Sequence, residues 1–415
     1  MARSTLSDVA RIEAALATEY GISDETQAEY YRRNDYSDSE IEKLLNEASS
    51  REYVRRASLT DLAACIVETL EPSFREFKPV PLFKKCQDIQ AEFGDNRVHA
   101  STGVSTVSLP GALGRLANKQ LLQSYNEVPA VLSSLAKKVK GRDYQTHTSY
   151  RVGLNDLLDE VSPGGEVRST SMTESGYDWR PSIHARSLSL AEEMITNDDL
   201  SVFLEASRAM GAAGKRRIEL ELAGLIQDSS RVDGAPTSGE FWFSSGTGPG
   251  NVQPNYMVGA SSALSLDSLA TADAMLRAQL DQAGDPCDLT GTHLLVLGEN
   301  HVLAKTLYNS TEVRPAGASS TTMPISNGFH RAFEPLTSEW LRSKRLVSPA
   351  AGTEWWLVHV GRTHLYQLGF VGSDVPVVET FEHVPNMLGI TMRAKLSFGV
   401  SLMDPRAAVY SKGAA

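Results

Sequence analysis

The chain has 415 residues, of which 41% are hydrophobic and 22% are charged, as in ordinary globular proteins, and its length predicts two or three subdomains. The formal net charge of −11 argues against a protein whose main task is to bind nucleic acid, because neutralising phosphates requires an excess of Lys and Arg. The 3 cysteines show no CxxC or Cys/His spacing, which predicts neither a disulfide framework nor a zinc site.

Residues 1–95 are predicted to be acidic and helical, with eleven Asp and Glu against five Lys and Arg in the first fifty residues. The polar residues 37–39 precede an amphipathic pattern that is typical of a capped helix. A second helix is expected from Thr60, with prolines ending it from Pro72 onward. No apolar run approaches the ~20 residues that span a bilayer, and no signal peptide is recognisable. We therefore expect synthesis and assembly in the cytoplasm.

A flexible joint is expected near residues 99–110, which are small and polar. A helix is predicted after it from Ala112 to Lys138, divided at Pro129.

A long hairpin is predicted over residues 143–190, because apolar and polar residues alternate there on both sides of a strong turn that contains Gly164 and Gly165. Both of its faces are polar, and an isolated two-stranded hairpin is only marginally stable in water. We therefore expect it to lie on a neighbouring subunit. Its candidate contact residues are Arg168, Tyr177 and Trp179.

A long helix is predicted over about residues 200–227, opened by a capping cluster of Asn197, Asp198 and Asp199. Gly211 and Gly214 within it are expected to allow another backbone to approach closely.

The rest of the chain is predicted to mix helices and strands without alternating βα units, so the fold class is α+β. Helices are expected at about 266–283 and 299–308. Strands are expected at 293–297, 355–360, 364–370, 375–380 and in a final pair over about 390–410. Trp355 and Trp356 alternate along one strand, which predicts one tryptophan in the core and the other at an interface.

The common catalytic motifs are missing from the sequence: there is no GxSxG elbow, no HExxH and no P-loop lysine motif. Gly246–Gly250 resembles a phosphate-binding loop only loosely. His359 and His364 could face each other across a hairpin, but packing is a more common role than metal binding for such a pair. We therefore expect no enzyme activity, no cofactor and no metal.

Three ordered segments carry a resemblance to a known family: VSLPGALGRLANKQLLQSYNEVP, TSYRVGLNDLLDEVSPGGEV and ITNDDLSVFLEASRAMGAAGKRR. With C-terminal segments such as LSFGVSLMDPRAAVYSKG, they resemble the major head subunits of Mu-like and related tailed phages over roughly residues 105–412. The resemblance implies the Hong Kong 97 phage-type capsid fold, which bacterial encapsulins share.

The resemblance also implies a division of the chain. Residues 1–95 would be a scaffold-like leader or connector, 96–142 the N-terminal arm, 143–190 the extended loop, 191–260 the peripheral domain with the spine helix, 261–388 the axial domain, and 389–415 strands that return to the peripheral domain. The implied function is the icosahedral shell of a phage head, built of hexamers and pentamers. Its implied partners are packaged DNA, a portal, a scaffold or maturation protease, and decoration proteins.

Two alternatives remain open from the sequence. An encapsulin-type compartment would share the fold and enclose a cargo enzyme, although the acidic leader favours a phage. A residual maturation protease would be a hydrolase, but no serine or histidine site is recognisable in the leader.

Overall fold

The computed structural model describes residues 10, 13–18, 21–34, 36–48, 109–154, 172–191, 200–227, 243–247, 252–281, 284–313, 325–347, 349–381 and 389–413. Several predicted features lie outside these residues. They are the helix expected from Thr60, the hairpin residues Gly164, Gly165 and Arg168, and the capping cluster at 197–199. The chain divides into two compact units. The first comprises Met1–Pro129, Ile183–Arg216 and Ser373–Ser397, and the second Ala130–Ser182, Arg217–Gly372 and Phe398–Ala415.

The first unit is mainly helical. Residues 13–18 are helical, and α2 (Asp24–Arg33), α3 (Asp38–Ala48) and α7 (Leu109–Glu127) follow. The hydroxyl of Ser23 accepts a hydrogen bond from the Thr26 N–H at 3.3 Å and so caps α2, which lies in the region predicted to be helical. In the same unit β12 (Val377–Phe381) pairs antiparallel with the first part of β13 (Gly389–Leu402). β4 (Ser182–Ala191) also pairs with β13.

The second unit contains most of the strands. β1 (Lys137–Gly141) pairs parallel with β11 (Tyr366–Val371), which pairs antiparallel with the last part of β13. A second sheet has the order β5-β14-β10-β6-β9. Its strands are β5 (Tyr256–Met257), β14 (Ala408–Ser411), β10 (Trp355–Val358), β6 (His293–Val296) and β9 (Glu334–Thr337). Short strands β7 (Glu312–Val313) and β8 (Ile325–Ser326) pair with each other.

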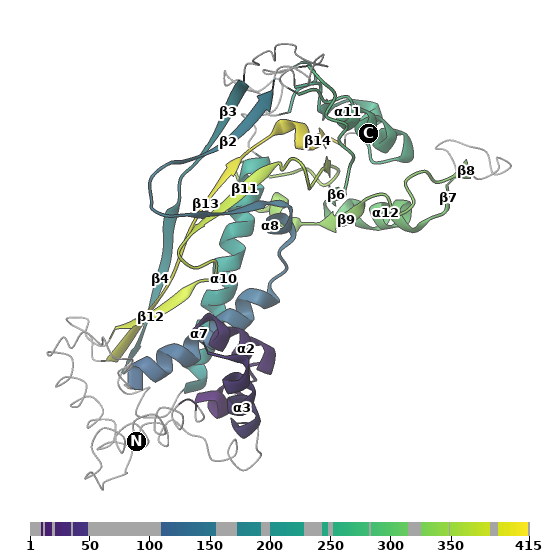
Figure 1. Ribbon diagram of the computed structural model, residues 1–415. Coiled ribbons are helices and arrows are strands. Elements are labelled where there is room, and N and C mark those ends of the chain that lie inside the picture. The colour runs from purple at the N-terminus through teal and green to yellow at the C-terminus, as the bar shows by residue number, and fades with distance from the viewer. Residues whose placement is uncertain are drawn as a thin grey trace, which may run out of the picture. The chain divides into compact units, whose positions relative to one another are not determined.

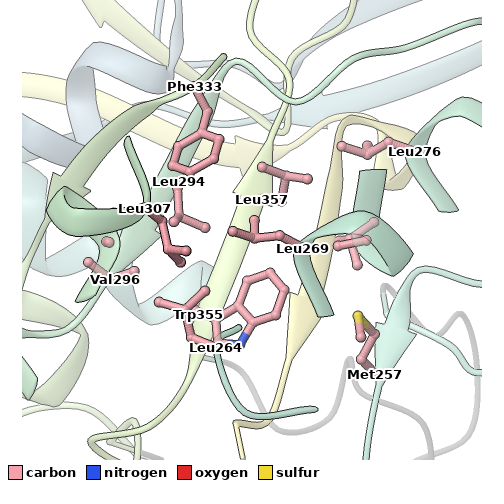
Figure 2. Close-up of a cluster of buried hydrophobic side chains, with 13 residues drawn as sticks. Met257, Leu264, Leu269, Leu276, Leu294, Val296, Leu307, Phe333, Trp355 and Leu357 are labelled. Carbon is pink, nitrogen blue, oxygen red and sulfur yellow. The ribbon is translucent and has the colours of Figure 1, made fainter. Parts of the chain in front are cut away.

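The core of the second unit lies on one face of this second sheet. α11 (Leu266–Arg277) and α12 (Gly298–Asn309) supply Leu269, Leu276 and Leu307, which pack with Leu294 and Trp355 of the central strands (Figure 2). Ser265 and Ser268 form a capping box at the start of α11, and the Gly298 N–H at the start of α12 donates to the Glu339 carboxylate at 2.7 Å. Apolar burial and capping together hold both helices on the sheet.

The interpretation of the tryptophan pair was wrong, because both side chains are buried. Trp355 lies in the core shown in Figure 2, where its indole N–H donates to the Ser262 carbonyl at 2.9 Å. Trp356, on the other face, stacks on Tyr410 at a centroid distance of 5.1 Å. This sheet is therefore covered on both faces, and Trp356 is not an interface residue.

Two other expectations need correction. The helix predicted from Ala112 to Lys138 is α7, then α8 (Val131–Leu135), and then the strand β1, because pairing with β11 draws Lys137 and its successors into a sheet. The helix expected to reach residue 283 ends at Arg277.

The long helix α10 (Leu200–Ile226) confirms the prediction and is the longest helix among the described residues. It contributes Leu200–Arg216 to the first unit and its last turns to the second.

Candidate functional site

The predicted long hairpin is two elements rather than one. β2 (His147–Leu154) and β3 (Met172–Trp179) form a two-stranded ribbon, with His147 opposite Trp179 at one end and Leu154 opposite Met172 at the other (Figure 1). The second strand then stops, because Pro181 has no N–H with which to continue a ladder. β4 follows it and pairs with β13 instead of with the first strand.

Exposed and half-buried side chains characterise the ribbon at residues 148–150 and 176–178, where the structure describes its side chains. Tyr150 is 69% exposed, and Thr148 donates across the ribbon to the Asp178 carboxylate at 2.6 Å. Tyr177 is half-buried. Because little apolar surface is covered, this part of the ribbon gains little stability from its own chain.

Trp179 anchors the base of the ribbon to the sheet formed by β1, β11 and β13. Its side chain is only 3% exposed and stacks on the His147 ring at a centroid distance of 4.8 Å. A Cβ atom placed on Gly369 of β11 or on Gly141 of β1 would come closer than 3.0 Å to the indole. Trp179 therefore fills a space that two glycines leave open, and it is buried by its own chain rather than by a neighbour, contrary to expectation.

A third glycine accommodates the backbone that follows Trp179. Gly399 of β13 lies directly opposite Gly369 of β11 in the antiparallel register. A Cβ atom on Gly399 would come closer than 3.0 Å to the Arg180 carbonyl. The hydroxyl of Ser149 also donates to the Gln367 side chain at 2.9 Å, so both strands of the ribbon contact the sheet at this end. We call Gly141, Gly369 and Gly399 the glycine notch.

The long helix crosses α7 within the first unit at a glycine. A Cβ atom on Gly211 would come closer than 3.0 Å to the Leu121 carbonyl and the Ser124 hydroxyl, so the backbones approach closely, as expected. Ser124 donates to the Arg208 carbonyl at 2.7 Å across the crossing. At Gly214 the neighbour is the ring of Pro376 rather than a backbone.

The end of α10 that belongs to the second unit carries a buried carboxylate. Glu219 is fully buried and accepts the N–H groups of Leu132 at 2.8 Å and Ser133 at 3.0 Å, at the start of α8. The Tyr366 hydroxyl donates to the Leu132 carbonyl at 2.9 Å. Burial, and then the charge of Glu219, hold the pKa of Tyr366 well above its usual value. Glu219 thus fixes the short helix that precedes β1.

The described part of residues 1–95 packs on α7 around a buried lysine. Lys119 of α7 is fully buried and donates to the Tyr31 hydroxyl of α2 at 2.8 Å, and its ammonium lies 4.4 Å from the centre of the Tyr31 ring. Arg115 donates through Nε to Glu13 at 2.9 Å. Burial lowers the pKa of Lys119 to about 8; Glu13 opposes this shift and Arg115 adds to it. No local pattern in the sequence predicts this cluster.

Of the two histidines singled out in the sequence, His359 makes a polar contact through its ring. The Nδ1 atom of His359 lies 2.8 Å from the Thr290 carbonyl. Burial, then Lys137 and His359, lower the pKa of His364. Among the described residues, no group of three His, Cys, Asp or Glu side chains could hold a metal ion, and no helix there is long and apolar enough to cross a membrane.

Comparison with solved structures finds shell proteins of low sequence identity. A capsid structure of the cyanophage P-SCSP1u is 14% identical, with 68% of this chain and 87% of that chain covered and a TM-score of 0.46. The capsid of an empty GTA particle is 10% identical, covering 69% and 90%, with a TM-score of 0.42. The holo-SrpI encapsulin complex from Synechococcus elongatus is also 10% identical, covering 69% and 88%, with a TM-score of 0.39. A comparison with curated protein sequences gives no match.

A protein family is identified from the sequence. A model described as phage capsid protein matches residues 177–411, more than half of the 415 residues. The protein is therefore a structural protein of a viral shell. It assembles with copies of itself and resides in the virion. The chain belongs to the phage capsid protein family. Its architecture is α+β, with a ribbon and a long helix.

Proposed function

We propose that this chain is the major subunit of the icosahedral head of a tailed phage and that the assembled shell encloses double-stranded DNA. The family match over residues 177–411 is the observation that carries the proposal. The net charge of −11 supports a container that contacts packaged DNA only non-specifically. The function is geometric, and we propose that the protein is not an enzyme.

The elements have distinct roles in this proposal. Residues 96–142 form the N-terminal arm, 143–190 the extended loop and 191–260 the peripheral domain with the spine helix. Residues 261–388 form the axial domain, whose tips meet in hexamers and pentamers. Of the last segment, 389–415, the strand β14 pairs with β10 and so adds to the axial sheet. The ribbon reaches a neighbouring subunit, and the helix bends at Gly211 and Gly214 when the shell expands. Residues 1–95 are a scaffold-like leader or connector.

The partners follow from the same proposal. Closed symmetric shells need a homo-oligomer with large buried interfaces, of order 2,000 Å² or more for each obligate contact. A portal, a scaffold or maturation protease, and decoration proteins complete the particle, which assembles in the host cytoplasm.

Imaging of the purified protein tests this proposal. The full chain would be expressed alone and with its neighbouring phage genes, and the product examined by negative-stain electron microscopy and for nucleic acid content. We expect closed particles of uniform diameter that contain DNA when the packaging machinery is present. Particles that enclose only a protein cargo would favour an encapsulin-type compartment instead, and a product that never forms shells would contradict the proposal.

A further inference from the structure

Four positively charged side chains lie on and next to the edge strand β1. Lys137, Lys138 and Lys140 are exposed on this strand, and the exposed Arg142 follows it directly. β1 ends its sheet, with no described strand on its outer side. We call these four residues the basic strand. They stand together even though acids outnumber bases in the whole chain by 51 to 40.

No acidic side chain neutralises the basic strand within the part of the chain that the structure describes. None of its four side chains forms an ion pair there. Asp143, which directly follows Arg142, contacts the His147 ring at 3.2 Å instead. Elsewhere in the same unit an exposed base has an acidic partner, as Arg342 has Glu299 at 3.0 Å. The charges of the basic strand therefore remain available to a partner that carries negative charge.

The backbone of β1 holds its lysines at a regular spacing. All 5 residues of the strand pair in parallel with β11, which fixes β1 in an extended form. Residues two apart on a strand share a face and lie about 6.6 Å from each other, as Lys138 and Lys140 do. Phosphates along one strand of B-DNA rise about 3.4 Å each, so these two lysines match alternate phosphates. An extended row of this kind fits a linear polyanion with a regular repeat.

We propose that the basic strand binds the phosphates of double-stranded DNA. The inference rests on the proposed function, in which the shell encloses DNA, and it names the surface of the subunit that contacts this DNA. The net charge of −11 makes the subunit as a whole repel DNA. A local row of four positive charges offsets this repulsion at one place. DNA therefore contacts the subunit there, without any recognition of base sequence.

Two other roles for the basic strand predict different behaviour. Charged side chains on an edge strand can prevent unwanted strand pairing, a role that does not involve DNA. The row can instead contact an acidic surface of a second copy, in which case its removal impairs shell assembly rather than DNA binding. The salt dependence of DNA binding separates both roles from a phosphate contact. Each phosphate that a base neutralises adds about 0.9 to the steepness with which log K falls against log salt.

The test measures how the unassembled full chain binds a short DNA duplex of arbitrary sequence, by fluorescence anisotropy over a range of salt concentrations. The wild type is compared with the triple variant Lys138→Gln, Lys140→Gln and Arg142→Gln. We expect the salt slope of the triple variant to be shallower by about 2 to 3, and its affinity at low salt to be about tenfold lower, because three phosphate contacts are lost. Lys138→Arg with Lys140→Arg keeps the positive charges and should bind within about twofold of the wild type.

The control is Lys305→Gln with Lys344→Gln and Arg345→Gln, the same loss of charge at three exposed residues of the second unit. It is expected to leave the salt slope unchanged, and circular dichroism checks that every variant is folded. Equal losses in the triple variant and this control would overturn the proposal, because only net charge would then matter, as would a wild type that does not bind the duplex. A triple variant that binds DNA normally but no longer assembles would also overturn it and assign the basic strand to a contact between copies. If the wild type forms no shells, the proposed function fails, whereas the DNA contact is decided separately by the salt slope.

Discussion

Gly369 of β11 lies directly opposite Gly399 of β13, and the segment that ends the ribbon lies over both residues. The indole of Trp179 fills the space above Gly369, and the carbonyl of Arg180 lies above Gly399. A side chain on either glycine would occupy that space. The pair therefore determines where the ribbon meets the sheet and so the direction from which it leaves.

Replacing Gly369 by alanine should loosen the base of the ribbon. The new methyl group meets a rigid indole rather than the end of a flexible side chain, so we expect a loss of about 1–3 kcal/mol in the free energy of unfolding. Urea unfolding measures this loss, and increased quenching of Trp179 fluorescence would report its exposure. The control is Gly328→Ala, because a Cβ atom there meets nothing within 4 Å. Equal effects of the two substitutions would contradict the role of the glycine notch.

Replacing Lys119 by methionine should change how stability depends on pH. Burial lowers the pKa of Lys119 from 10.5 to about 8, so the folded state releases this proton before the unfolded state does. Between pH 8 and 10.5 the unfolded state therefore binds more protons than the folded state. The free energy of unfolding of the wild type increases as the pH rises through that window. Below pH 8 the buried charge is destabilising, by about 3 kcal/mol at most.

We therefore expect Lys119→Met to be more stable than the wild type at pH 7 and to lose this advantage by pH 10. Urea unfolding of both proteins across this range measures the difference. Lys43→Met removes an exposed lysine and serves as the control. A difference between wild type and Lys119→Met that stays constant with pH would show that the lysine is not buried as a charged group.

Replacing Glu219 by alanine should destabilise the start of α8. Two buried N–H groups would lose their acceptor, at an expected cost of about 2–4 kcal/mol. Glu219→Gln keeps one acceptor oxygen and should cost less. Glu221→Gln removes a carboxylate that pairs with Arg217 on the same helix, and its effect should stay below about 1 kcal/mol. Thermal unfolding ranks the three variants, and a ranking with Glu221→Gln lowest in stability would disprove this assignment.

Mature particles should contain no covalent link through the ribbon. No lysine occurs between Ser149 and Ser189, so the amine needed to form an isopeptide bond is missing from this segment. Arginine remains protonated and cannot replace it as a nucleophile. Denaturing electrophoresis of boiled, reduced particles should therefore give a single monomer band. A ladder of larger species would contradict this expectation.

The sequence by itself determined the elements whose residues repeat with a clear period. The apolar run at 293–297 predicted β6, and the spaced apolar residues after position 200 predicted α10. The ordered motifs also predicted the capsid family that the match over residues 177–411 confirms. These features are local, or are ordered along the chain, and therefore can be read without knowing which segments meet.

Only the tertiary structure decided which residues meet across long sequence separations. Gly369 and Gly399 are ordinary strand glycines until Trp179 and Arg180 lie on them. Lys119 occupies a helical position that suits a solvated lysine, and it is buried only because α2 covers it. Pro181 could mark an irregularity in one strand or the start of a new pairing, and only the pairing of β4 with β13 selects the second. Such contacts depend on the shape of the surface that a distant segment presents, and no local pattern in the sequence encodes that shape.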